Sequence, residues 1–393
     1  MSFPDPAEKS IVAGTAGQHS GPFSVKAEPC GQSALFAFTK AHFTKAHLMT
    51  SDANAAQARQ ENARAWVLKL SRYREPSTGR SLFELLVTLV PFVMLWVLAW
   101  AAMQISPWLS LAIAILNGGF LVRIFIIQHD CGHASYFRNR TVSDWLGRAL
   151  GVLTLTPYDV WRRTHAIHHA HHGDLDRRGI GDVLTLTVAE YRARGWFGRL
   201  IYRLYRHPLV LFVLGPAYMF ILHNRLPFGL MKSGWRYWTS AMGTNALIAM
   251  VVGLILWLGG LMPLLLIYIP TSVIGATIGV WLFYVQHQFE KTQWAKEPDW
   301  QIHDAALEGS SHYQLPAPLQ WMTGNIGVHH VHHLYSRIPF YRLTEVLRDH
   351  AALAQAQKLT IRQSLACVKL KLWDENTQKL MSFREMRQVY GTG

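Results

Sequence analysis

Four long apolar runs alternate with polar segments along the chain. They cover residues 82–103, 108–127, 242–258 and 262–285, and each is close to the ~20 residues that a helix needs to cross a bilayer. The first pair of runs is joined only by the turn QISP and the second pair only by the turn GGLM. The pattern therefore predicts an all-α integral membrane protein with four transmembrane helices in two tight hairpins.

A fifth apolar stretch, residues 208–222, is short for a membrane span and contains Gly215 and Pro216. If this stretch crossed the membrane, the polar segments that follow residues 127 and 285 would lie on opposite sides of the bilayer. Both segments are rich in histidine, and we expect them to meet. The sequence therefore predicts an interfacial or re-entrant helix at residues 208–222.

Composition and charge support the membrane assignment. Half of the residues are hydrophobic and 16% are charged, below the roughly 25% of a soluble domain. The net charge of +14 also fits a nucleic-acid-binding protein. The arginines, however, lie between the apolar runs, as in cytoplasmic loops of membrane proteins. Those after the first hairpin are Arg138, Arg140, Arg148, Arg162, Arg163, Arg177 and Arg178. We expect an inner (cytoplasmic) membrane protein with both polar segments in the cytoplasm.

The two ends of the chain differ from the apolar middle. Residues 1–55 are rich in Gly, Ser and Pro, repeat FTKAHFTKAH and lack an apolar signal segment. We expect a disordered extension there, with Met49 as an alternative first residue, one domain over residues 56–345 and a cytoplasmic tail over residues 346–393. Three scattered cysteines exclude a disulfide framework and a four-thiolate iron–sulfur cluster.

Three histidine clusters, HDCGH, HAIHHAHHG and GVHHVHHLY, have helical spacing. Residues at i, i+3 and i+4 project from one side of a helix. The histidines that share such a side are His129 and His133, then His165, His168 and His169, then His329, His332 and His333. His171 and His330 lie off these faces, and His172 would rejoin its face only if the helix continued past Gly173.

Chance histidines on helix surfaces would explain one such cluster but not three on the same side of the membrane. Neutral imidazole is a common metal ligand, and this number of histidines indicates more than one ion. A structural zinc site is normally rich in cysteine, and neither the zinc-protease HExxH helix nor the ExxH pairs of soluble di-iron bundles occur. Zinc is also redox-inert. Iron is therefore the best candidate. Its position beside membrane spans indicates oxygen chemistry on an apolar substrate.

The stretches HDCGH, WRRTHAIHH, GDLDRRGIGD, FYVQHQFE and GNIGVHHVHHLYSRIPFY resemble the membrane fatty acid desaturases, most closely bacterial acyl-lipid enzymes. The resemblance covers roughly residues 60–345. It implies a di-iron centre, four spans and a cytoplasmic helical cap. It also implies that His165, His168 and His169 are the second set of ligands, because the family's second cluster follows Trp-Arg. An alternative register uses the HHAHH run and includes His171 and His172.

The resemblance implies further site residues. His287 resembles an additional iron ligand at the end of the last span, although a histidine that anchors the helix end is the alternative. Asn325 is the counterpart of a water-mediated partner of an iron, or else a turn residue. Carboxylates that are candidates to orient ligand imidazoles, or to pair with nearby arginines, are Asp130, Asp174, Asp176 and Asp182.

The function implied by the resemblance is the oxygen-dependent introduction of a cis double bond into a fatty acyl chain, with membrane lipid acyl chains as substrates. The twelfth and the ninth carbon are both open as positions. Neither GxGxxG nor the HPGG of a fused cytochrome occurs, so electrons must come from a separate carrier such as ferredoxin, and Arg177 and Arg178 would suit an acidic one. A membrane di-iron hydroxylase of an alkane, carotenoid or other lipid is the alternative. A metal transporter would carry ionisable residues within its spans, which hold few beyond Glu84 and Arg123.

Overall fold

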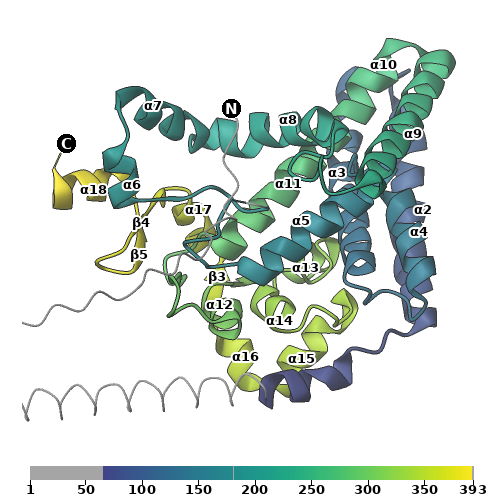
Figure 1. Cartoon of the computed structure of the whole chain (residues 1–393). Helices are drawn as coiled ribbons and strands as arrows, with labels where there is room; N and C mark the ends of the chain where they lie inside the picture. The colour runs from purple at the N-terminus through teal and green to yellow at the C-terminus, as the bar shows by residue number, and fades with distance from the viewer. Residues whose placement is uncertain (1–64, 180, 392–393) are drawn as a thin grey trace, which may run out of the picture. The chain divides into compact units, whose positions relative to one another are not determined.

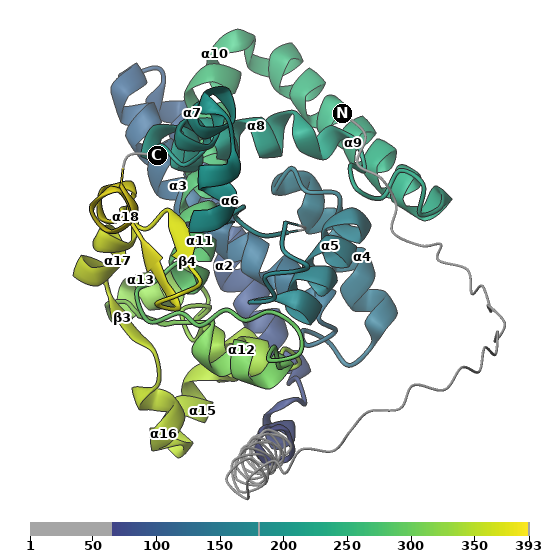
Figure 2. The same ribbon diagram turned by 60° about the vertical axis from the view of Figure 1, so that its left-hand side comes forward.

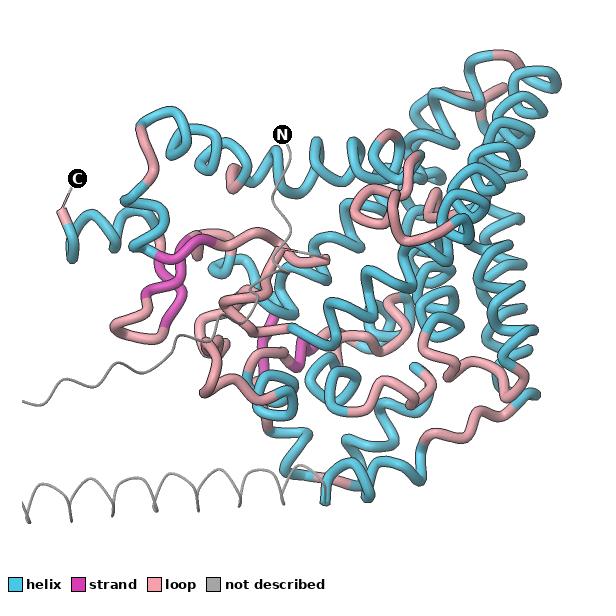
Figure 3. Tube along the Cα trace, in the orientation of Figure 1, coloured by secondary structure: helices cyan, strands magenta, loops and turns pink. Residues whose placement is uncertain are grey.

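The computed structural model describes residues 65–179 and 181–391, and this part of the chain is mostly helical (Figure 1, Figure 3). The expected disordered extension and Met49 lie outside the described residues. Four described helical stretches are long and apolar enough to cross a membrane. They are α2 (Thr78–Ala102), α3 (Pro107–Gly132), α9 (Trp235–Gly259) and the stretch Leu261–His287, which joins α10 (Leu261–Pro263), η4 (Leu264–Tyr268) and α11 (Ile269–His287). These four candidate spans agree with the prediction in length and composition, and their pairing in two hairpins stays a prediction.

The fifth apolar stretch forms a bent helical segment. Helix α7 (Trp196–Tyr205) and the turns Val210–Arg225 meet at 60°, so together they have the length of one broken span or of a re-entrant loop. The second part consists of η2 (Val210–Leu214), α8 (Gly215–Ile221) and η3 (His223–Arg225). The interfacial or re-entrant placement of this segment stays a prediction.

Helix α3 packs between α2 and α11 and fixes the relative positions of the histidines at their ends. A side chain on Gly118 would lie within 3 Å of Ile274, and one on Gly275 would collide with Leu121. The two glycines therefore allow α3 and α11 to approach closely, as small residues do in membrane helix pairs. On its other side, α3 contributes Arg123, which forms a fully buried ion pair with Glu84 of α2.

The remaining described helices lie outside the four candidate spans. They are α4 (Arg140–Leu153), α5 (Tyr158–His171), α6 (Val188–Ala193), α12 (Ile302–Glu308), α13 (Ala317–Met322), α14 (His329–Leu334), α15 (Leu343–Asp349), α16 (Ala351–Gln355), α17 (Ile361–Cys367) and α18 (Phe383–Tyr390), with the short helices η1 (Ser71–Tyr73) and η5 (Phe340–Arg342). In two views α18 and β4 lie at one end of the molecule, and α4 and α9 lie at the other (Figure 1, Figure 2).

The described residues also form five short strands, so the expected all-α class holds only as a mostly helical one. Strand β1 (Leu186–Thr187) pairs in parallel with β4 (Leu372–Asp374), which pairs antiparallel with β5 (Lys379–Met381). Strand β2 (His312–Gln314) pairs in parallel with β3 (Lys358–Thr360). Segments after residue 345 therefore pair with strands from the middle of the chain, and the expected boundary at 345 falls inside α15.

Candidate metal centre

Four helices carry the histidine clusters, and each places them at or near a helix end. Helix α3 carries His129 in its last turn and has His133 as its C-terminal capping residue. Helix α5 starts after Pro157, whose fixed backbone angle suits a helix start, and carries the second cluster in its later turns. Helix α14 begins at His329, and His287 is the last residue of α11.

The structure brings all nine of the predicted histidines into two adjacent groups. In each group, one ligand nitrogen from every residue lies within 4.8 Å of the others. The first group, called here the five-histidine group, contains His129, His133, His165, His169 and His332. The second, called the four-histidine group, contains His168, His287, His329 and His333. Each group therefore has the donor set for one metal ion.

Histidines that are neighbours in sequence fall into different groups. The pairs at i and i+4 stay together: His165 with His169, and His329 with His333. The residues at i+3, His168 and His332, each join the other group. Residues that differ by one position are separated by about 100° around a helix, so they face different points in space. The shared face predicted from spacing is therefore divided between two sites.

Distances between the ring nitrogens test whether the site fits an ion. In the five-histidine group, Nε2 of His165 lies 3.0 Å from Nε2 of His133 and 3.1 Å from that of His169. In the four-histidine group, Nε2 of His329 lies 3.0 Å from that of His287 and 3.1 Å from that of His333. Two nitrogens at about 2.1 Å from one ion lie about 3.0 Å apart at a right angle and about 3.4 Å apart at a tetrahedral angle. The residues therefore fit a metal ion, and they fit right-angled ligation better than a tetrahedral zinc site.

Burial keeps these imidazoles in the form that binds metal. Burial, with neighbouring histidines as a further cause, lowers the pKa of six of these imidazoles outside the spans well below the usual value. They are His133, His165, His169, His329, His332 and His333. The rings are therefore neutral at pH 7, and a neutral ring has a free lone pair for a metal. The clustered lone pairs can therefore hold a metal ion.

Two carboxylates contact outer nitrogens of the groups, one on each side. Oδ1 of Asp182 lies 2.5 Å from Nδ1 of His168, whose Nε2 is buried and has no hydrogen-bond partner within the described chain. Such a contact sets the tautomer and directs Nε2 into the group. Oδ1 of Asp130 lies 3.3 Å from Nδ1 of His129, while its Oδ2 accepts a hydrogen bond from the backbone of Phe340.

The other predicted partners lie elsewhere. Asp174 accepts a hydrogen bond from the backbone of Asp176, and none of the described hydrogen bonds joins Asp174 to a histidine of either group. Asn325 adopts a positive φ of 55° and donates its side-chain amide to the carbonyl of Phe340, as a turn residue would. Its role as a partner of an iron stays a prediction.

His172 is the residue that sequence reasoning placed least well. It caps α5 instead of continuing the helix, is buried, and donates a hydrogen bond from Nε2 to the carbonyl of Gly309 (2.9 Å). Its ring centre lies 4.1 Å from that of His287 and 4.8 Å from that of His333. The signal was its spacing of four from His168, which Gly173 obscured. His171 and His330 bond to backbone carbonyls outside the groups.

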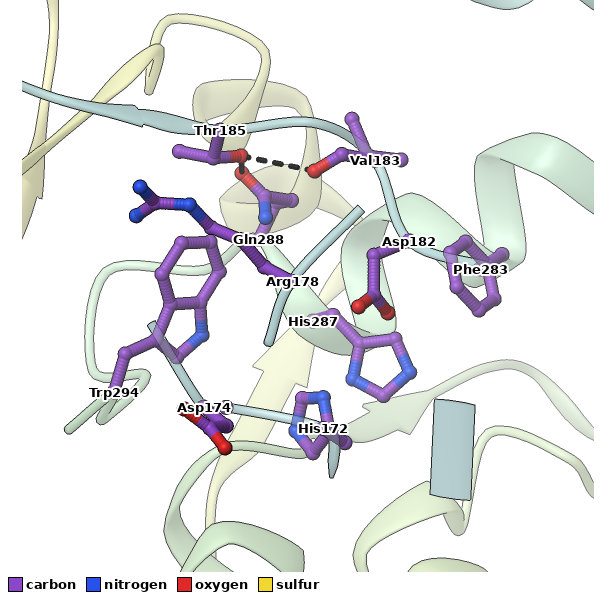
Figure 4. A pocket seen from close by; sticks show the side chains of 11 residues that line it. His172, Asp174, Arg178, Asp182, Val183, Thr185, Phe283, His287, Gln288 and Trp294 are labelled. Carbon is purple, nitrogen blue, oxygen red and sulfur yellow. Dashed lines mark hydrogen bonds between the residues drawn. The ribbon is translucent and has the colours of Figure 1, made fainter. Parts of the chain in front are cut away.

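A small cavity borders the four-histidine group (Figure 4). It measures about 30 Å³, room for one or two water-sized molecules. His172 and His287 lie side by side at its edge, with Asp182 and Phe283 next to them. The ring centre of Phe283 lies 5.1 Å from that of His168 and 5.0 Å from that of His287. An apolar ring therefore borders the predicted ligands on this side.

Comparisons with known proteins show which family the chain resembles. A model of the fatty acid desaturase family matches residues 106–365. A fatty acid desaturase of Bacillus subtilis (strain 168) is 41% identical over 321 residues, covering 82% of this chain and 91% of the relative. In Synechocystis, an sn-1 acyl-lipid omega-3 desaturase (ferredoxin) is 29% identical, covering 58% of this chain and 64% of the relative. An sn-1 oleoyl-lipid 12-desaturase of the same organism is 28% identical, covering 60% and 67%.

Proposed function

The chain belongs to the fatty acid desaturase family, and we propose that it is an acyl-lipid desaturase whose nine clustered histidines hold two iron ions. One ion would be held by the five-histidine group and one by the four-histidine group. The observation that carries the proposal is the spacing of 3.0–3.1 Å between ligand nitrogens in both groups. When bound, the iron pair would activate O₂ for removal of two hydrogens from neighbouring methylene carbons.

The reaction balances only with electrons from outside. The acyl chain loses two hydrogens and gains a double bond, while O₂ takes up these two hydrogens together with two further electrons and two protons to give two waters. No GxGxxG segment occurs in the sequence, so we propose that a separate carrier such as ferredoxin supplies the electrons. The printed name of the Synechocystis omega-3 relative includes ferredoxin, which supports this choice.

The residues around the ions position the acyl chain and exclude water. The histidines lie at the ends of α3 and α11, so a chain that enters from the bilayer meets them without crossing an aqueous layer. Phe283 presents an apolar surface beside His168 and His287. Fixed rings and apolar walls hold one carbon–carbon bond in place, which lowers the entropic part of the barrier. The names of the Synechocystis relatives support a lipid-linked acyl substrate.

The arginine distribution supports a cytoplasmic site in the inner membrane. The segments that carry the histidines are those with excess arginine, and such segments stay in the cytoplasm. Arg177 and Arg178, however, are poor candidates for contact with an acidic carrier. Arg177 pairs with Glu297 at 2.7 Å, and Arg178 pairs with Glu190. Their charges are therefore already balanced within the chain.

The deciding experiment expresses the protein in a bacterial host that lacks polyunsaturated lipids, supplies a ferredoxin and its reductase, and profiles the lipids by mass spectrometry. We expect a new double bond with the intact chain and none with His168→Ala. His207→Ala is the matched control, because His207 is exposed and outside both groups. A hydroxylated product would replace the desaturase by the hydroxylase alternative, and an unchanged lipid profile with the intact chain would contradict the acyl substrate.

A further inference from the structure

A second cavity opens beside the five-histidine group, between the end of α3, helix α5 and the start of α9. It has a volume of about 340 Å³ and is called here the arginine cavity. Two predicted metal ligands, His133 and His165, line it together with Trp161. Arg162, Arg163 and Arg236 also line it. The cavity therefore joins a cationic region to the metal centre.

The cavity lies at the ends of two candidate spans. Gly132 is the last residue of α3, and Arg236 is the second residue of α9. Next to it, Trp235 is 78% exposed, as expected of an aromatic residue at a membrane interface. The ends of spans lie at the level of the lipid headgroups. The arginines of the cavity are therefore at the depth where phospholipid phosphates occur.

The charges around the cavity do not cancel. Asp159 pairs with Arg148 and Arg236, at 2.9 Å and 2.5 Å. Asp144 pairs with Arg162 at 3.1 Å. Of the charged residues that line the cavity, Arg162, Arg163 and Arg236 are cationic and only Asp159 is a carboxylate. Arg163 is exposed and forms no ion pair within the described part of the chain. Arg163 therefore has a positive charge that no described carboxylate balances, and this charge matches the single negative charge of a phospholipid phosphodiester.

The wall of the cavity is rigid at the side of the metal site. Trp161 stacks on His165, with ring centres 4.7 Å apart and an angle of 17° between the planes. A side chain at position 132 would lie 2.8 Å from Trp161, so Gly132 is what allows the indole to pack there. An acyl chain entering past Trp161 would reach His133 and His165 directly.

We propose that the arginine cavity binds the phosphate of a glycerophospholipid, with Arg163 as the principal contact and Arg162 and Arg236 beside it. The acyl chain of the same lipid extends from the phosphate toward the metal centre. The assignment rests on the proposed function, since it identifies the headgroup of the acyl-lipid substrate. An acidic carrier protein is the less suitable occupant, because a folded protein would contact the exposed Arg163 without filling the cavity between His133 and Arg236, whereas a phosphate on a flexible lipid enters it.

Binding without turnover tests the proposal. Native mass spectrometry of the full chain, metal-loaded and in neutral detergent, would compare dioleoyl-phosphatidylglycerol with dioleoylglycerol, which has the same acyl chains and no phosphate. We expect Arg163→Gln to weaken binding of the phospholipid about tenfold, equivalent to ~1.4 kcal/mol, and Arg163→Lys to restore most of it. Binding of dioleoylglycerol should stay unchanged. Arg362→Gln is the control, because Arg362 is exposed on α17 and does not line the cavity. Arg236→Gln serves as a second variant.

Several results would overturn the proposal. If Arg163→Gln weakened the binding of both lipids equally, the cavity would have changed shape. If phospholipid binding stayed unchanged and reduction by ferredoxin became slower, the arginines would be a contact surface for the carrier. Glycerol 3-phosphate binding as tightly as the phospholipid would make the cavity a free-phosphate site. A failure of the proposed function has a different signature: the phospholipid binds through Arg163, but no bound lipid is desaturated.

Discussion

The two histidine groups hold similar donors in different surroundings. The five-histidine group borders the open arginine cavity, and its members His133 and His165 are only half-buried. The four-histidine group borders a cavity of about 30 Å³ and is backed by the buried ring of His172 and by Asp182. One group thus borders open space, and the other is enclosed. Two ions held by these groups would therefore differ in accessibility, and we expect them to differ in how tightly they are held.

Removing one ligand from each group gives the largest expected effect. His129→Ala and His329→Ala should each reduce desaturation more than 100-fold, because both ions are needed, yet each should lower bound iron from about two to about one per chain. Metal analysis together with Mössbauer spectra of iron-57-loaded protein measures both. Loss of both ions from either variant would mean that the groups form one inseparable site, and the comparison would fail. His207→Ala should retain both.

The two orienting carboxylates offer a matched comparison of intermediate size. Asp182→Asn should lower the iron affinity of the four-histidine group by 10–100-fold, because the short contact with Nδ1 of His168 is lost. Asp130→Asn should affect the five-histidine group less, since its contact with His129 is 3.3 Å long. Competition with a chelator during iron loading measures both affinities. Equal effects of the two substitutions would show that the shorter contact carries no additional weight.

The smallest expected effect concerns the ion pairs behind the five-histidine group. Burial alone would raise the pKa of Asp159, but hydrogen bonds from Arg148 and Arg236 outweigh it and hold the pKa below its usual value. The contribution of these ion pairs to the free energy of unfolding is therefore complete above the ordinary carboxyl pKa of about 3.9. It is lost as the pH falls through the lower pKa of Asp159 in the folded protein. Asp159→Asn should cost about 2 kcal/mol at pH 7.

Thermal unfolding in detergent between pH 7 and pH 3 checks this prediction. The difference in Tm between the intact chain and Asp159→Asn should stay constant down to about pH 5 and shrink below about pH 4. Iron content at pH 7 should be unchanged, because Asp159 contacts no histidine among the described hydrogen bonds. A difference in Tm that grows as the pH falls would have the opposite sign to the one expected, and it would show that the ion pairs do not cause it.

Much of the site was predictable because helical spacing is a local property. The pairs His129/His133, His165/His169 and His329/His333 each follow from a separation of four, and the structure keeps each pair in one group. The separation of three is where local reasoning stopped. It places His168 near the face of His165, but whether a side chain about 60° away around the helix meets the same ion depends on which helix lies opposite.

His172 and the C-terminal segment show the same limit. Gly173 correctly predicted the end of α5, but the capping conformation of His172 returns its ring to the site, which helix periodicity does not describe. Strands β3 and β4 are three residues each, and their parallel partners β2 and β1 lie far away in sequence, so no local pattern predicts these pairings.

The sequence by itself determined the four apolar spans, the family and the residues able to bind metal, because hydrophobicity, charge and helical phase depend only on residues that are neighbours in the chain. Only the tertiary structure decided how the histidines divide into groups of five and four, and that arginines from α5 and α9 share one cavity. It also decided that His168 and His332 each belong to the other group than the remaining ligands of their own helix. These features depend on the packing of helices that are distant in the chain, and packing is fixed by contacts that no single segment contains.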